Sequence, residues 1–270
     1  MLPTFLIIGT MKGGTTSLFY YLAEHPRVRM AAMRESDFFV ARRNHGKGLE
    51  WYESLYEGPE GPTAFGESSP NYAKRQIFPG VPERMHAAVP DARLIYCLRD
   101  PIDRIVSHWV HNASQGRERR TLEDALRDPH DSNYVLTSRY HYQIQAYLPY
   151  YDIDRILFVD SLDLRSDRKG TLRRTFAFVG VDPDYDSEAF DLLHHESSAK
   201  ERPARMDRFV PSVRARNALR PILPSYLSAP RPIETPVLSP PVRGRLEDAL
   251  RPDAEALRAM TGLAFSEWSV

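Results

Sequence analysis

The chain has 270 residues, 42% of them hydrophobic and 11% aromatic, so it can bury a full core and is short enough for one domain over residues 1–270. Its 36 basic and 36 acidic side chains give a formal net charge of +0, which excludes a global field that would collect nucleic acid or an anionic membrane surface. The single cysteine, Cys97, excludes an internal disulfide and a cysteine-rich zinc site. We therefore expect any anion site to be local, and Cys97 to be an inert thiol within a strand.

The apolar runs of the sequence are short. Residues 5–8 are typical, and they are far below the roughly 18 residues that a membrane helix needs. No basic residue precedes Phe5, as a signal peptide would require. We expect no membrane span and a cytoplasmic protein.

Apolar runs and helical spacing alternate along the first two thirds of the chain. Residues 5–9 predict a buried strand, and helical spacing follows from Thr15 through Leu18 and Leu22. Further strands are predicted at residues 63–66, 93–98 and 155–160, and further helices at 140–151 and 171–179, the latter ending at Gly180. This alternation predicts an α/β fold with a central parallel β-sheet flanked by helices.

A helix is predicted directly after the strand at 93–98. Asp100 is a suitable cap, and Pro101 suits the first helical position. The apolar stripe of this helix consists of Ile102, Ile105, Val106, Trp109 and Val110.

Residues 200–241 lack periodicity and contain nine of the 22 prolines. Six arginines lie between Glu201 and Arg220 against two acidic residues, so the segment is locally basic. Helical spacing resumes at Val242. We interpret residues 200–241 as an irregular lid or acceptor-binding region rather than a domain linker.

Residues 9–17 combine a strand end, a glycine pair and a helix start. Glycines let backbone N–H groups approach phosphate oxygens, and a helix N-terminus adds positive potential. The candidate phosphate-binding residues are Lys12, Gly13, Gly14, Thr15, Thr16 and Ser17. Lys12 precedes the glycine pair, unlike the lysine of G-x-x-x-x-G-K-[ST], which weakens an ATP or GTP interpretation. The alternative is a glycine-rich turn with a solvated lysine.

Arg99 and Ser107 form a second candidate phosphate site. Arg99 ends a predicted parallel strand, where open α/β sheets bind ligands, and Ser107 adds a hydroxyl from the following helix. Alternatively, Arg99 pairs with Asp100 or Asp103. Together with residues 9–17, this site suits a nucleotide that carries phosphates at both its 5′ and 3′ ends.

These segments resemble the two nucleotide-binding motifs of sulfotransferases that use 3′-phosphoadenosine 5′-phosphosulfate (PAPS). The likeness is greatest to the Golgi heparan sulfate sulfotransferases and their bacterial relatives. Residues 7–18 are similar to their 5′-phosphosulfate loop, and residues 93–101 with Ser107 resemble their 3′-phosphate motif. His25-Pro26, residues 35–39 and residues 66–72 follow the family in order and spacing. The likeness is strong over residues 5–109, fades through 160 and is thin beyond.

The resemblance implies transfer of a sulfuryl group from PAPS to a hydroxyl or amine by in-line displacement. By this resemblance PAPS leaves as adenosine 3′,5′-bisphosphate without any metal. We expect the acceptor to be a small molecule, a lipid or a carrier-bound group, because the sequence shows no secretory or membrane segment that would take the enzyme to extracellular glycans. Lys12 would contact the 5′-phosphate, with the amides of residues 13–17 around it, while Arg99 and Ser107 would hold the 3′-phosphate. Glu35 matches the general base, its pKa raised by burial near Phe38 and Phe39 or its carboxylate oriented by Lys12. Otherwise Glu35 is a surface acid.

The sequence departs from the family at two places. The heparan enzymes carry a lysine where this chain has Ser68, so a second cationic contact to sulfonate or substrate is missing. Their cysteine pair is also absent, and we interpret Lys200 as a remnant of that loop.

Histidines offer an alternative base, because sulfotransferases of small phenols and steroids use one. His108 and His111 flank Trp109, although such residues are more often helix-surface or core histidines. The pair His194-His195 with Glu196 hints at a metal, but adjacent helical side chains diverge, and we predict none. Rival interpretations are a P-loop-type nucleotide kinase and a catalytically silent nucleotide-binding protein.

Overall fold

The computed structural model describes residues 1–191, 201–202 and 231–270. Its centre is a five-stranded sheet in the order β2-β3-β1-β4-β5, and every neighbouring pair is parallel. The strands are β1 (Phe5–Gly9), β2 (Val28–Met30), β3 (Ala64–Ser68), β4 (Arg93–Leu98) and β5 (Ile156–Asp160). The predicted α/β class and parallel sheet are confirmed, whereas the short strand β2 was not predicted.

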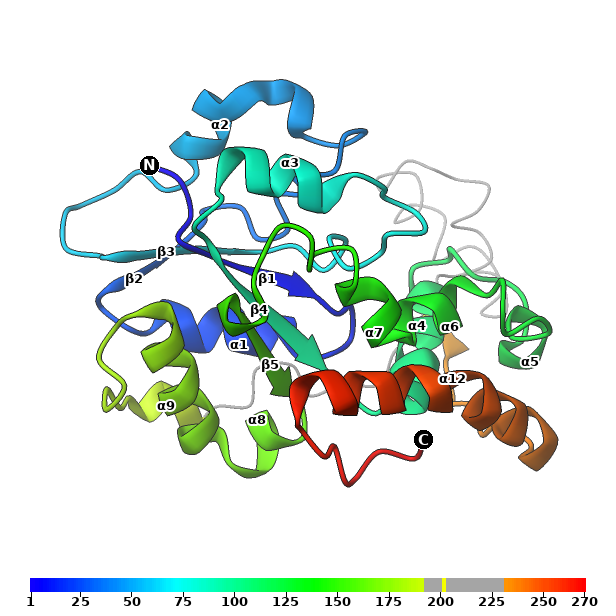
Figure 1. The fold of residues 1–270 in the computed structure, drawn as a ribbon. Helices are drawn as coiled ribbons and strands as arrows, with labels where there is room; N and C mark the ends of the chain where they lie inside the picture. Colours follow the sequence, from blue (N-terminus) through cyan, green and yellow to red (C-terminus); the bar gives the residue numbers. More distant parts are fainter. Residues whose placement is uncertain (192–200, 203–230) are drawn as a thin grey trace, which may run out of the picture.

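Helices surround this sheet (Figure 1). The α-helices are α1 (Thr15–Ala23), α2 (Gly48–Ser54), α3 (Val81–Ala88), α4 (Pro101–Ser114), α5 (Leu122–Ala125), α6 (Asn133–Ser138), α7 (Tyr140–Ile144), α8 (Asp163–Ser166), α9 (Arg168–Val179) and α12 (Pro240–Thr261). Short 3-10 turns lie at His45–Lys47, Ile153–Arg155 and Glu188–Asp191, and β6 (Glu201–Arg202) pairs antiparallel with β7 (Arg231–Pro232). No helix within the described ranges is long and apolar enough to cross a membrane.

Alternating side chains of β1 build a core on each face of the sheet. Phe5 and Ile7 pack in one cluster with Leu18 of α1 and Phe176 of α9. Leu6 and Ile8 belong to the opposite cluster, which includes Met85 of α3. Figure 1 shows α1 and α9 on one face, α2 and α3 on the other, and α4, α6 and α12 beyond the carboxyl ends of the strands.

The predicted start of α4 is confirmed. The Asp100 side chain accepts a hydrogen bond from the amide of Asp103 at 2.8 Å, and Pro101 is the first helical residue. The buried stripe of α4, including Ile105 and Trp109, packs in one cluster with Leu246 of α12. Capping and packing therefore fix the helix that carries Ser107.

The predicted helix at residues 140–151 is wrong in its second half, because α7 ends at Ile144. Pro149 lacks an amide donor and disfavours helical geometry in the residue before it. Tyr147 and Tyr151 remain buried, and their hydroxyls donate to the backbone oxygens of Tyr72 and Val89 at 3.1 Å. The chain after α7 therefore continues as hydrogen-bonded turns that still bury these tyrosines.

The remaining predicted elements agree with the structure where it describes them. Helix α9 ends at Gly180, whose φ of 84° is left-handed, and Val242, Leu246 and Leu250 are buried on α12. Residues 233–239 are irregular, as expected. Residues 240–241 of the proposed lid begin α12, and residues 201–202 and 231–232 form the short strands β6 and β7. The rest of the lid lies outside the described residues, as do Lys200 and His194-His195 with Glu196.

Candidate active site

The order of the strands places the candidate site. The chain leaves β1 toward β2 and β3 on one side of it, whereas β4 and β5 lie on the other side. Connections that diverge in this way open a crevice at the carboxyl ends of parallel strands, where α/β proteins bind ligands. The loop after β1, the residues after β3 and the residues after β4 all reach this edge.

The loop after β1 is a tight turn. The amide of Thr10 donates to the Cys97 oxygen at 2.7 Å, and the amide of Gly13 donates to the Thr10 oxygen at 2.9 Å. A Cβ at Gly13 would lie 2.6 Å from the Cys97 oxygen, so only glycine fits. Lys12 and Gly14 both have left-handed backbones, with φ of 71° and 95°.

Helix α1 begins directly after this turn, at Thr15. The amide of Leu18 makes the first helical hydrogen bond, to the Gly14 oxygen at 3.1 Å. The N–H groups in the first turn of an α-helix give its start a positive potential. The Thr16 hydroxyl accepts a hydrogen bond from Arg34 Nη1 at 2.9 Å. The turn and helix start therefore form a backbone N–H cradle suited to an anion.

The second predicted segment follows β4. Arg99 pairs through Nη2 with Asp103 Oδ2 at 3.0 Å, so the local ion pair considered as the alternative is present. The Asp103 side chain is 63% exposed, and a pair of this kind is weak enough for an anion to displace. Ser107 lies half-buried on α4, two turns further on.

Arg104 joins the two segments, and sequence reasoning did not select it. Its guanidinium is fully buried, with Nη1 donating to the backbone oxygen of Met11 at 3.3 Å. Its other partners are the Tyr134 backbone oxygen, the Ser138 hydroxyl and His108 Nδ1. Burial lowers its pKa to about 10, and none of the ion pairs found among the described residues involves it. Arg104 therefore places an uncompensated positive charge beside the glycine turn.

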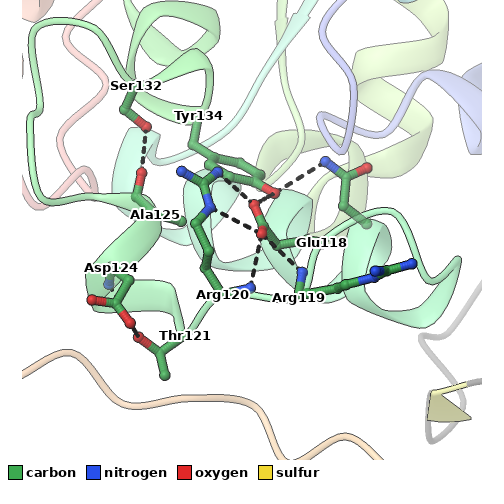
Figure 2. Close-up of polar contacts among 9 residues, drawn as sticks. Glu118, Arg119, Arg120, Thr121, Asp124, Ala125, Ser132 and Tyr134 are labelled. Carbon is green, nitrogen blue, oxygen red and sulfur yellow. Dashed lines mark hydrogen bonds and ion pairs between the residues drawn. The ribbon is translucent and has the colours of Figure 1, made fainter. Parts of the chain in front are cut away.

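Glu118 accepts a hydrogen bond from Tyr134, the residue whose backbone oxygen binds Arg104. Its carboxylate accepts the amides of Arg119 and Arg120 at 2.9 and 3.0 Å, the Arg120 guanidinium, and the Tyr134 hydroxyl at 3.1 Å (Figure 2). The hydrogen bonds from Arg120 are the main reason why the pKa of Glu118 falls to about 2. This network fixes Tyr134, whose backbone oxygen holds Arg104.

A cavity of about 540 Å³ lies beside this network, along α5 and the residues before α6. It is lined by both basic and acidic side chains, with Arg120 and Arg127 against Asp124, Asp128 and Asp131. None of the residues predicted to bind phosphate lines it. Its mixed charge does not define a ligand class.

Glu35 lies in the loop after β2, beside the carboxyl end of β3, and its backbone is left-handed, with φ of 62°. Its amide donates to the Ser68 oxygen at 2.9 Å. The expected burial of Glu35 near Phe38 and Phe39 is wrong, because Glu35 is exposed. The two phenylalanines instead pack into the core, where Phe38 stacks on Tyr52 with ring centroids 4.1 Å apart. An exposed carboxylate at this edge is open to an acceptor from solvent.

Two buried ionisable groups flank the position of Glu35 and were not predicted. Glu67 on β3 is fully buried and accepts a hydrogen bond from the Ser36 hydroxyl; burial raises its pKa to about 7. Lys74 is buried with Nζ 2.8 Å from Asn71 Oδ1 and 3.4 Å from Met11 Sδ, and burial lowers its pKa to about 8. No local pattern marks either residue; only their burial in the folded chain does.

The histidines differ in their surroundings. His108 is buried against Arg104, and burial, followed by the charges of Arg104 and Lys74, lowers its pKa well below the usual range. It is therefore a neutral core histidine. His111 is half-exposed on the same helix. Across residues 1–191, 201–202 and 231–270, no group of three or more His, Cys, Asp and Glu side chains is placed to hold a metal.

A parallel α/β sheet with an N–H cradle and unpaired buried cations at its switch point defines a class of anion- or nucleotide-binding α/β proteins. Comparison with known families makes the assignment narrower. The model of the sulfotransferase domain matches residues 2–209, and the chain belongs to this family, as the motifs predicted.

Similar proteins include two types of heparan sulfate enzyme. The chain is 30% identical over 208 residues to mouse bifunctional heparan sulfate N-deacetylase/N-sulfotransferase 4, covering 70% of this chain and 23% of that protein. It is 33% identical over 187 residues to human heparan sulfate glucosamine 3-O-sulfotransferase 3A1, covering 67% of this chain and 45% of that protein. The chain thus spans less than half the length of either relative.

A solved structure has a similar fold. The crystal structure of a sulfotransferase from Alicyclobacillus acidocaldarius superimposes with a TM-score of 0.73 at 23% identity, covering 100% of both chains. The described part of this chain therefore has the fold of that sulfotransferase.

Proposed function

We propose that the protein is a sulfotransferase that moves the sulfuryl group of PAPS onto a hydroxyl or amine of a small-molecule, lipid or carrier-bound acceptor. One observation carries the proposal: the hydrogen bond from Arg104 to Met11 joins two anion-suited segments at one edge of the sheet. A nucleotide with phosphates at both its 5′ and 3′ ends needs two such segments at a fixed spacing.

The residues present fit this donor. The N–H groups at the start of α1 suit the 5′-phosphosulfate. Gly13 permits the tight turn before this helix, because a Cβ there would lie 2.6 Å from the Cys97 oxygen. Lys12 supplies charge beside it. The 3′-phosphate suits Arg99 and the half-buried Ser107. The ion-pair partner of Arg99, Asp103, is exposed, so a phosphate can replace it. The buried charge of Arg104 gives the whole edge a positive bias toward an anionic ligand.

In the proposed reaction Glu35 is the general base. The acceptor oxygen or nitrogen attacks sulfur in line with the bond to the 5′-phosphate oxygen, that bond breaks, and adenosine 3′,5′-bisphosphate leaves. Glu35 takes the acceptor's proton, and Lys12 stabilises the charge that develops on the departing phosphate. The proposed step uses no metal.

The exposure of Glu35 supports its proposed role toward the acceptor. Glu35 is solvent-accessible and its neighbours Met33 and Arg34 are exposed too, so a free or carrier-bound acceptor can approach without crossing the core. The basic segment around residues 202–220 lies mostly outside the described residues, and its role at the acceptor stays a prediction. A single domain over residues 1–270 and a cytoplasmic location also stay predictions.

The experiment is transfer of radiolabelled sulfuryl from PAPS to panels of hydroxyl, amine and carrier-bound acceptors, with and without a chelator. Labelled acceptor together with adenosine 3′,5′-bisphosphate, undiminished by the chelator, is the expected result. A thermal-shift comparison with ATP and Mg²⁺ runs in parallel. Stabilisation by ATP–Mg²⁺ but not by adenosine 3′,5′-bisphosphate would instead favour the kinase alternative. Binding of the bisphosphate without any transfer would favour a silent nucleotide-binding protein.

A further inference from the structure

Lys74 carries a buried charge that the protein does not neutralise. The residue is 5% exposed, and its Nζ has two protein partners: the Asn71 amide oxygen at 2.8 Å and the Met11 thioether sulfur at 3.4 Å. An ammonium has three N–H donors, and a thioether is a weak acceptor. No carboxylate within the described ranges forms an ion pair with it. Its donors are therefore incompletely satisfied.

The chain path explains how Lys74 reaches the glycine turn. After β3 ends at Ser68, the amide of Ser69 donates to the Ile7 oxygen at 3.1 Å, and the amide of Ala73 donates to the Ile8 oxygen at 3.0 Å. Residues 69–74 thus return across the end of β1. Lys74 emerges against Met11, the residue directly before Lys12.

Neighbouring groups hold the ammonium in place. Asn71 accepts from Lys74 and donates through Nδ2 to Asp37 Oδ2 at 2.9 Å, so the orientation of its amide is fixed from both sides. The carboxylates of Asp37 and Glu35 attract the charge of Lys74, whereas Arg104 and Arg117 repel it. Two buried cations, Lys74 and Arg104, therefore contact Met11 from different elements. Burying such charges is costly unless an anion joins them.

We propose that Lys74 supplies the second cationic contact to the sulfuryl group and 5′-phosphate of PAPS, in place of the lysine that relatives carry at the position of Ser68. This rests on the proposed function. The return of residues 69–74 across β1 compensates for a shift of six positions along the sequence. As the sulfur–oxygen bond breaks and charge collects on the departing phosphate, Lys74 acts together with Lys12.

The test begins with Lys74→Met, which keeps the length of the side chain and removes its charge. We expect turnover to fall by about 10²-fold while the affinity for adenosine 3′,5′-bisphosphate changes by less than about tenfold. The melting temperature in the absence of nucleotide should stay the same or rise, because an unpaired buried charge has been removed. Lys47→Met, at an exposed position beside Trp51, is the matched control and should have wild-type turnover.

The second part of the test places a lysine at position 68 in a protein that lacks the charge of Lys74. Ser68→Lys combined with Lys74→Met should recover at least tenfold of the lost turnover, which a merely structural role for Lys74 would not allow. Lys74→Gln serves if the methionine variant does not fold, and the same drop in turnover is expected. Wild-type turnover per folded molecule in either Lys74 variant, or a drop in melting temperature with turnover intact, overturns the inference.

The outcomes separate this inference from the function on which it rests. A wild-type protein that binds adenosine 3′,5′-bisphosphate and transfers sulfuryl, with Lys74 variants equal to it, refutes only the role of Lys74. A wild-type protein that does neither refutes the proposed function, and the inference falls with it.

Discussion

Arg104 donates a hydrogen bond from Nη1 to the backbone oxygen of Met11 at 3.3 Å, across 93 positions of sequence. Met11 belongs to the glycine turn after β1, and Arg104 belongs to the helix that carries Ser107. A fully buried side chain thus sets the spacing between the two segments that we assign to the 5′ and 3′ phosphates. A buried guanidinium has little freedom to move within a packed interior. The spacing between the two segments is therefore set by the fold before any nucleotide binds.

Glu35→Gln tests the general base. Glutamine keeps the size and hydrogen-bonding reach of the side chain but cannot accept the acceptor's proton. We expect turnover to fall by about 10²-fold or more, with nearly unchanged affinity for adenosine 3′,5′-bisphosphate. Steady-state transfer of labelled sulfuryl measures the first quantity, and calorimetry measures the second.

Glu60→Gln, another exposed glutamate, is the control for this prediction and should behave like the wild type. His111→Ala should have a much smaller effect than Glu35→Gln. An active Glu35→Gln enzyme beside an inactive but folded His111→Ala enzyme would move the general base to the histidine.

Lys12→Ala tests whether the charge of Lys12 stabilises the transition state more than the bound ground state. Negative charge builds on the departing 5′-phosphate as the reaction proceeds, so the lysine should contribute more to the transition state than to the ground state. We expect a loss of about 10²-fold in kcat, and a smaller loss in PAPS affinity. Single-turnover rates and equilibrium binding separate the two. Abolished binding with an unchanged rate in the bound state would make Lys12 a ground-state anchor only.

Much of this fold follows from sequence patterns, for reasons visible at particular residues. The glycine turn and the Asp100-Pro101 cap are local signals, and both lie where they were predicted. Strand β2 escaped prediction because its three residues, Val28–Met30, are too few to show a period. The helix predicted over residues 140–151 ends early, and Pro149 is the signal that was overlooked.

The candidate site was less predictable than the fold. Lys12, Arg99 and Glu35 each belong to a motif of adjacent residues. Lys74 and Arg104 belong to the site through tertiary contacts with Met11, which no spacing in the sequence reveals. Glu35 was expected to be buried near Phe38 and Phe39. Instead, the two phenylalanines point into the core and Glu35 is exposed.

Glu67 predicts a pH dependence of stability. Burial raises its pKa from 4.5 to about 7 in the folded protein, so between these values the folded chain holds a proton that the unfolded chain has lost. The free energy of unfolding should therefore fall as pH rises from about 4.5 to about 7. Glu67→Gln should remove this part of the slope in denaturant unfolding measured across that range. An identical slope in the variant would contradict the assignment of Glu67.

Glu118 predicts the opposite sign. Its pKa is lowered to about 2 in the folded protein, so the stability it contributes is present above pH 4.5 and is lost as pH falls toward 2. Because its partner Arg120 is 60% exposed, we expect Glu118→Gln to lower the free energy of unfolding by only about 1 kcal/mol at pH 7. Urea unfolding at pH 7 and pH 3 measures this difference. A loss as large at pH 3 as at pH 7 would show that the ionised carboxylate is not the cause.

The most direct test of the two-phosphate site is calorimetric binding of adenosine 3′,5′-bisphosphate and adenosine 5′-monophosphate to the wild type and to Arg99→Ala. The 3′-phosphate should strengthen binding by at least about tenfold in the wild type, because Arg99 and Ser107 engage it in addition to the contacts at the glycine turn. Arg99→Ala should lose most of that preference and leave the affinity for the monophosphate nearly unchanged. Equal affinities of the two nucleotides for the wild-type protein would contradict a site for the 3′-phosphate, and with it the use of PAPS.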